Sequence, residues 1–198
     1  MSTTYSNTLP LTVTTYQNWY VDTAAAPGGD GLSWETAWNA LRPNWDGLPA
    51  GDHIINCRGG VDEGWALTFS TTGATSVTLR GDWSGFDVYE DCYRFRSTEY
   101  RCFAASTAGR TLRLENIVFE SAANSVPTNH GHVIEAGLST LEVVNSAIIG
   151  HADVDQTFPF YVLWAHDGSA KIYNSILMYG NMLQEGKATS KVVRADPG

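Results

Sequence analysis

Carboxylates and histidines are the side chains of this sequence that could carry acid–base chemistry or hold a metal ion. The groups that stand close together in the chain are Asp62 with Glu63, His132 with Glu135, and Asp153 with Asp155. Glycoside hydrolysis needs two carboxylates that face one another across a groove. None of these groups forms a stacked acidic column, so solvated surface positions are the simpler interpretation.

Histidines are the next candidates for chemistry, because a metal site needs at least three convergent ligands. Four of the histidines stand near the ends of apolar segments, namely His130, His132, His151 and His166. Their spacing does not repeat, so nothing predicts that they converge. We therefore expect no metal and no cofactor.

The cysteines do not form a recognisable pattern either. They are an odd number without C-x-x-C spacing, at Cys57, Cys92 and Cys102. Neither a disulfide framework nor a zinc site is supported. Buried free thiols are expected, with a Cys92–Cys102 bridge as the alternative in an oxidising medium.

Three asparagines form the strongest pattern in the chain. Asn116, Asn145 and Asn174 stand 29 residues apart, each in the same local frame. A constant period in this range is typical of proteins built from stacked repeats. Asparagine tolerates the left-handed backbone conformation of a tight bend. We therefore expect each asparagine to bend the chain between two strands, and the three side chains to form a structural ladder of amides.

Apolar and polar residues alternate before each asparagine. The matching apolar positions are Leu112 and Leu114, Leu141 and Val143, and Ala170 and Ile172. The charged residues between them are Arg113, Glu142 and Lys171. A period of two predicts strands with one buried and one solvent-facing side.

The same frame extends upstream and predicts two or three strands in each repeat. Phe103, His132 and Tyr161 align in that frame. Earlier segments around Ile54 and Val77 fit it loosely, because residues 82–100 read as a long aromatic and charged insertion.

The N-terminal part of the chain adds to this pattern. Residues 20–52 contain a D…GGDG.S…A…L stretch followed by GD.I. Together with the repeats, roughly residues 19–181 resemble the right-handed parallel β-helices of the pectin-lyase-like superfamily. The resemblance implies an all-β fold, a short right-handed parallel β-helix of about five coils with a capping helix and an extended arm. It implies no single function, because this fold hosts lyases, hydrolases, adhesins and viral spikes.

The expected organisation has four regions. They are an extended N-terminal arm (1–18), a segment with the capping helix (19–52), the parallel β-helix (53–183) with the insertion 82–100, and a C-terminal tail (184–198). A frayed end is the alternative interpretation of the arm.

The capping helix is expected over residues 32–42. Ser33 is a favourable N-cap residue. Trp34, Trp38 and Leu41 would lie on one helical face and cover the first coil.

Length and charge restrict the partners. The 198 residues correspond to one domain. The formal net charge of −9 argues against nucleic acid as a partner. Because no long apolar run and no Lys/Arg-led apolar stretch at the N-terminus are present, we expect no membrane partner and no signal peptide.

Aromatic residues are plentiful, with 7 Trp, 9 Tyr and 7 Phe, and many lie outside the repeated strands. Such residues either cover an open end of the stack or form an interface. The interface candidates are Tyr5, Leu9, Leu11, Tyr16, Trp19, Trp83, Phe86, Tyr89 and Tyr93.

The leading functional interpretation is a non-enzymatic structural protein of a virus particle. The resemblance points to tailed bacteriophages, whose proteins often use this fold without a secretion signal. A capsid decoration (cement) protein is expected, with a short spike or fibre module as a variant. The partner would be the major capsid protein or another virion protein, the location the virion, and the assembly a trimer, as the resemblance implies.

The alternative interpretation is a β-helix spike or enzyme that binds or cleaves a glycan. Its acids would be Asp153, Asp155 or Glu135. The residues that would stack on sugar rings are Trp83, Tyr89, Tyr93 and Trp164. A surface adhesin domain is a third interpretation, which the Met1 start disfavours.

Overall fold

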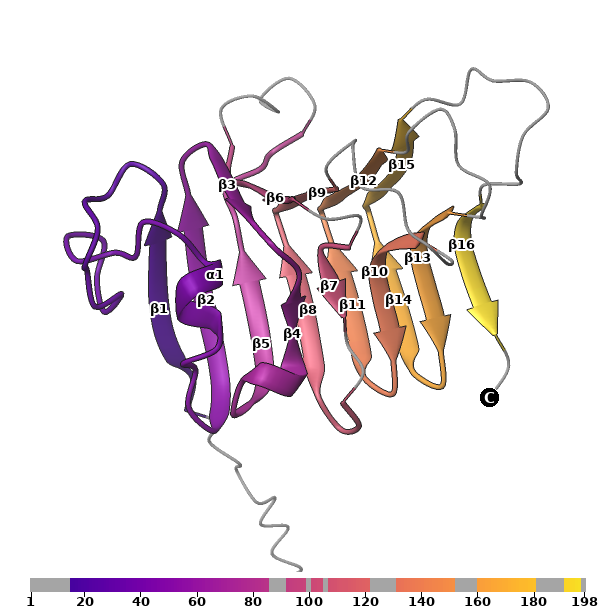
Figure 1. Cartoon of the computed structure of the whole chain (residues 1–198), viewed down its shortest axis with the longest axis horizontal. Helices are drawn as coiled ribbons and strands as arrows, with labels where there is room; N and C mark the ends of the chain where they lie inside the picture. Colours follow the sequence, from indigo (N-terminus) through magenta and orange to yellow (C-terminus); the bar gives the residue numbers. More distant parts are fainter. Residues whose placement is uncertain are drawn as a thin grey trace, which may run out of the picture.

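Parallel β-strands dominate the computed structural model, which describes residues 15–85, 92–98, 101–104, 107–121, 131–151, 160–180 and 191–196. They form three sheets, all with parallel pairing (Figure 1). Sheet A contains, in spatial order, β1 (Gln17–Asp22), β2 (Gly51–Arg58), β5 (Ala74–Arg80), β8 (Thr111–Glu115), β11 (Thr140–Val144) and β14 (Ser169–Tyr173).

The other two sheets are built from the strands that follow in each repeat. Sheet B contains β3 (Val61–Gly64), β6 (Arg94–Ser97), β9 (Val118–Ser121), β12 (Ala147–His151) and β15 (Ile176–Gly180). Sheet C contains β4 (Leu67–Thr68), β7 (Phe103–Ala104), β10 (Gly131–Gly137), β13 (Phe160–His166) and β16 (Lys191–Asp196). The short helical segments are α1 (Arg42–Trp45) and the 3₁₀ turn η1 (Phe69–Thr71).

From β2 onward, the chain visits the sheets in the constant order A, B, C. We call each set of three successive strands, such as β8–β9–β10, a coil. Thr140 pairs with Thr111 and also with Ser169, so the coils that begin with β8, β11 and β14 are offset by the predicted 29 residues. The predicted all-β class is confirmed, and stacked parallel sheets of this kind are consistent with a β-helix-like fold.

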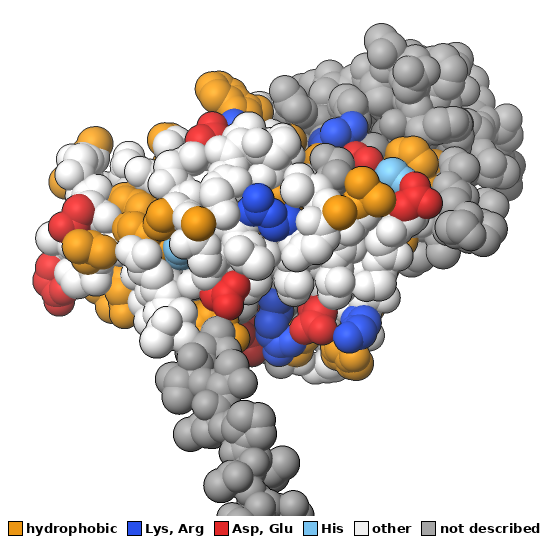
Figure 2. Space-filling view, turned by 90° about the horizontal axis from the view of Figure 1, so that it is seen from below, with side chains coloured by type: hydrophobic (Ala, Val, Ile, Leu, Met, Phe, Trp, Pro, Cys, Tyr) orange, Lys and Arg blue, Asp and Glu red, His pale blue; other side chains and the backbone are white. Residues whose placement is uncertain are grey.

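The predicted alternation of buried and exposed positions is confirmed in β8 and β11 of sheet A, but it is wrong for the last strand, β14, where Ile172 is 37% exposed. Leu112 and Leu141 are fully buried and belong to the hydrophobic core between the sheets. The charged residues between the buried ones pair outside: Arg113 Nη1 lies 2.9 Å from Glu142 Oε2, and Lys171 Nζ lies 3.4 Å from Glu142 Oε1. Figure 2 shows acidic and basic side chains side by side on the face seen from below.

The register of sheet C differs from the predicted frame at one strand. Tyr161 pairs with His132 as expected, but Phe103 pairs with Ile134, two residues further on. A shift of two residues keeps the same face of a strand inward. Phe103 and Ile134 therefore both reach the core, where each is fully buried.

The prediction of a helix over residues 32–42 is wrong, because α1 (Arg42–Trp45) begins only at Arg42. Local side-chain bonds favour turns here: Thr36 Oγ1 donates to Asp30 Oδ1 (2.6 Å), and the Thr36 amide donates to Ser33 Oγ (3.3 Å). Trp38 then forms an isolated parallel β-bridge with Val21. Its amide donates to the Tyr20 carbonyl, and its own carbonyl accepts from the Asp22 amide. Pairing with the sheet edge thus outweighs the helical periodicity.

The same segment nevertheless covers the N-terminal end of the stack. The Trp38 ring stacks on Trp19 with 4.8 Å between centroids. Leu41 and Trp45 are fully buried against the first coils. An aromatic cover therefore replaces the expected helical one.

Two regions expected outside the repeat contribute strands to it. The insertion 82–100 contains β6, and the tail 184–198 contains β16, which pairs with β13. Within the described residues, no helix is long and apolar enough to cross a membrane.

Candidate functional site

A polar cluster lies on the outer face of sheet C. Glu135 on β10 and Trp164 on β13 are direct register partners on neighbouring strands. His166 follows two residues after Trp164, so it points to the same side of the strand. Arg101 precedes β7 and also reaches Glu135. We call these four residues the sheet C cluster.

The contacts within the sheet C cluster are short. Glu135 Oε1 lies 2.9 Å from His166 Nε2, and Glu135 Oε2 lies 3.4 Å from Arg101 Nη1. The Trp164 and His166 rings lie 4.5 Å apart between centroids. The Glu135 side chain is 13% exposed and that of His166 is 27% exposed, so the pair is partly shielded from water but accessible.

The environment of His166 favours its charged form. Desolvation lowers its pKa, but hydrogen bonds to Glu135 and Asp167 outweigh that effect and raise the pKa above 6.5. Its two ring nitrogens already lie near carboxylate oxygens, Nε2 at 2.9 Å from Glu135 and Nδ1 at 3.5 Å from Asp167, beside the indole ring of Trp164. A partly exposed carboxylate–imidazole pair next to an aromatic ring suits a hydroxyl-rich ligand, because the carboxylate oxygens can accept further hydrogen bonds.

The structure brings together only part of the predicted glycan set. Glu135 and Trp164 are adjacent, whereas Asp153 and Asp155 lie outside the described residues. The side chains of His132 and His151 also lie outside them. In the part of the chain that is described, no group of three or more His, Cys, Asp or Glu residues could hold a metal ion.

The three repeated asparagines occupy equivalent corners between sheets A and B. Their φ angles are 53° at Asn116, 46° at Asn145 and 44° at Asn174, all in the left-handed region. The amide Nδ2 of Asn174 donates to Oδ1 of Asn145 at 2.8 Å. The following serines add a second row, in which the Ser146 amide donates to Ser175 Oγ at 3.1 Å.

The aromatic interface candidates have different positions. Tyr16 is exposed, whereas Trp19 is half-buried and donates from Nε1 to His53 Nδ1 at 3.1 Å. Trp83 and Tyr93 are buried inside this molecule, so they are not available to a partner. The candidates Tyr5, Leu9, Leu11, Phe86 and Tyr89 lie outside the described residues.

Asp62 is buried, although the sequence predicts a position at the surface. Asp62 lies in β3 and is almost fully buried. Its Oδ2 accepts from the Tyr93 hydroxyl at 2.6 Å and from the Leu41 amide at 2.7 Å. The sequence gives only a weak signal for this burial, since β3 is short and its alternation of apolar and polar residues is not distinctive.

The sequence also does not predict the role of Arg101, because its partner Glu135 lies more than one repeat away.

The chain was compared with protein-family models, with curated proteins and with solved structures, and none of them matches. The geometry of the described residues is therefore the basis for a functional proposal.

Proposed function

We propose that this chain is a right-handed parallel β-helix and a non-enzymatic structural protein of a virus particle. It decorates a capsid lattice, with the major capsid protein as its partner, and associates as a trimer. A spike or fibre module of the same particle is the variant of this proposal.

The position of the N-terminal strand carries the proposal. β1 is the outermost strand of sheet A. Its C-terminal half pairs with the segment around Trp38, whereas residues 15–18 are exposed, with Tyr16 49% exposed. Residues 1–14 precede this strand in the sequence. A segment attached at an exposed strand edge can add to a sheet or groove of another protein.

The outer faces of the sheets also support a structural role. On sheet B, Arg96 bridges Glu63 (3.5 Å) and Glu120 (3.1 Å). On sheet A, Arg80 pairs with Glu115 at 3.1 Å. Because these charges are paired within the molecule, the faces can pack between subunits with limited cost of burying unpaired charge.

Removal of residues 2–14 is expected to reduce binding to decoration-free capsids by at least about tenfold, which corresponds to about 1.4 kcal/mol. The deletion leaves β1 intact, so the circular dichroism spectrum and melting temperature should not change. Co-sedimentation with capsids measures the binding. A variant in which the same residues are replaced by a Gly-Ser linker of equal length is the control for chain length. Undiminished binding of both variants would contradict the role of the arm.

Glycan binding at the sheet C cluster is a second candidate, and a specific observation favours it. Glu135 and Trp164 lie side by side, and His166 lies 2.9 Å from Glu135. This candidate predicts that Trp164→Ala weakens binding to an immobilised glycan.

A further inference from the structure

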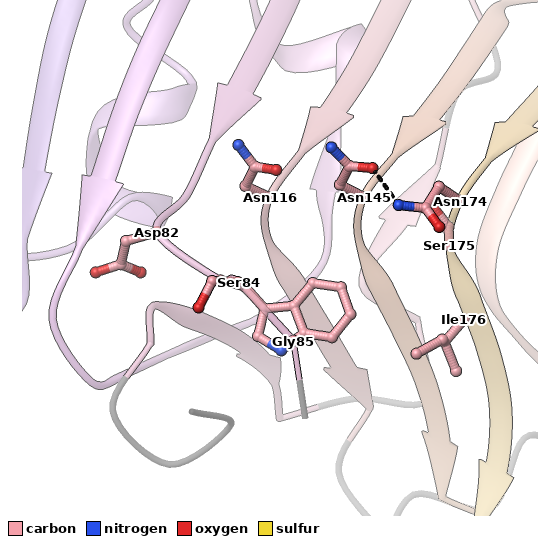
Figure 3. Close-up of a pocket in the computed structure, with 9 residues that line it drawn as sticks. Asp82, Ser84, Gly85, Asn116, Asn145, Asn174, Ser175 and Ile176 are labelled. Atoms are coloured by element: carbon pink, nitrogen blue, oxygen red, sulfur yellow. Dashed lines mark hydrogen bonds between the residues drawn. The ribbon is translucent and has the colours of Figure 1, made fainter. Parts of the chain in front are cut away.

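A groove runs along the corners at which the repeated asparagines turn the chain. It holds about 660 Å³ and is lined by Asp82, Trp83, Asn116, Asn145, Asn174 and Ser175, together with their neighbours. We call it the asparagine groove. Figure 3 shows the three amides in a row on one side and the segment around Ser84 on the other. The volume lies within the range of small-ligand sites.

The amide row has unused hydrogen-bonding capacity. Neighbouring asparagines lie one strand spacing apart, so the row spans about 10 Å, longer than one pyranose ring. The bond between Asn174 and Asn145 uses one donor and one acceptor. In Figure 3 no hydrogen bond joins the Asn116 side chain to another of the groove residues drawn. Within the part of the chain that the structure describes, the donor and the acceptor of that amide are thus available to a ligand in the groove.

The opposite wall is held in place by packing. The Trp83 amide donates to the Asn116 carbonyl at 2.8 Å, and the Asp82 carboxylate accepts from the Tyr93 amide at 2.7 Å. The buried Trp83 ring packs with Val118 and Ala147 on the outer face of sheet B. The groove is thus preformed, which reduces the ordering cost of binding.

The charge of the groove selects among ligands. Of the described residues that line it, Asp82 alone is charged, and it is negative. An anionic chain would meet this carboxylate without a basic residue to offset it. Hydroxyl groups, in contrast, both donate and accept, as a primary amide does. Ile176 adds an apolar surface to the same groove.

We propose that the asparagine groove binds a neutral oligosaccharide, with Asn116, Asn145 and Asn174 as the ligands of its hydroxyl groups. This site is separate from the sheet C cluster and does not depend on the capsid role.

The test is an array of immobilised neutral oligosaccharides, acidic oligosaccharides and extended peptides. The full chain is expected to be retained on neutral oligosaccharides. Asn145→Gly removes one amide while keeping a residue that tolerates the left-handed conformation. Asn116→Asp is isosteric and replaces the donor by a negative charge. Each variant is expected to weaken retention by about tenfold.

The matched control is Leu138→Gly. Leu138 also has a left-handed φ angle, of 33°, but is exposed at the corner between β10 and β11. This variant should bind as the unchanged chain does, and melting temperatures verify that all variants fold. Any one of three results would overturn the proposal. The first is no retention of the chain on neutral oligosaccharides, and the second is stronger retention on acidic oligosaccharides or on peptides. The third is unchanged retention of both groove variants. Loss in Trp164→Ala alone would assign the binding to the sheet C cluster instead.

Discussion

Replacing Trp45 by alanine is expected to lower the free energy of unfolding by about 3–5 kcal/mol. The Trp45 side chain is 0% exposed and packs against Phe69 and Phe103, with ring centroids 5.9 and 5.8 Å away. Its Nε1 donates to the Thr68 carbonyl at 2.7 Å. The substitution leaves a large cavity at the covered end of the stack and removes one of the two side-chain hydrogen bonds to the Thr68 carbonyl, leaving only that from the Thr71 hydroxyl. Urea unfolding followed by circular dichroism measures the loss.

Trp65→Ala is the matched control for this experiment. Trp65 is 60% exposed, and its main contact is the Arg42 guanidinium, 5.4 Å from the ring centroid. An exposed cation–π contact contributes about 0.5–1 kcal/mol. A loss at Trp45 no larger than that at Trp65 would show that the N-terminal cover does not close the core.

The second large effect is expected at Asp62. Asp62→Ala leaves the Tyr93 hydroxyl and the Leu41 amide without their acceptor. An unsatisfied buried donor costs about 1–3 kcal/mol, so the variant should lose at least that much stability near pH 4. Asp62→Asn should lose far less, because both bonds go to Oδ2 and an amide oxygen can accept both.

The pH dependence distinguishes the carboxylate from the amide. Burial raises the pKa of Asp62 above its ordinary value of 3.8, and the bonds from Tyr93 and Leu41 only partly oppose this. The folded protein therefore holds this proton more tightly than the unfolded chain. Its contribution to stability is full below pH 3.8 and is lost as the pH rises through the folded pKa. Asp62→Asn should thus gain stability relative to the unchanged protein as the pH rises.

Glu142→Gln is the control, because its stability relative to the unchanged protein should fall, not rise, as the pH rises. The hydrogen bond from Arg113 lowers the pKa of Glu142, so its contribution is present above pH 4.5 and is lost in acid. Unfolding experiments from pH 3 to pH 7 compare the two variants. If Asp62→Asn became less stable relative to the unchanged protein as the pH rose, the carboxylate would be stabilising as an anion, contrary to this account.

The repeated part of the fold could be predicted from the sequence because its signals are local. The asparagine corners and the alternation around Leu112 and Leu141 each depend on a few adjacent residues. The 29-residue offset then follows from stacking, since each corner must lie above the previous one.

The remaining features depend on contacts between distant segments. Trp38 and Leu41 have helical spacing, but the edge of β1 competes for the backbone of Trp38. Tyr93 resembles a surface aromatic in its charged surroundings, yet its hydroxyl reaches Asp62, 31 residues away. The strand in the tail, β16, pairs with β13, a contact between distant segments that its own sequence does not indicate.

The candidate site was predictable only in part for the same reason. Glu135 and Trp164 were expected in one glycan set, and the register of sheet C makes them neighbours. Arg101 joins them from outside the regular repeat. The groove beside the asparagines requires the segment around Asp82 to fold back over sheet B, which no periodic pattern indicates.

Quantitative mass spectrometry of purified virus particles tests the central proposal most directly. The measurement counts copies of this chain relative to the major capsid protein. A capsid decoration protein should be present in a fixed, near-stoichiometric ratio to the major capsid protein. Particles made without the chain should lack its peptides and keep those of every other particle protein. A few copies per particle would indicate the spike or fibre variant. Absence of the chain from particles would contradict the structural role and leave glycan binding as the function to pursue.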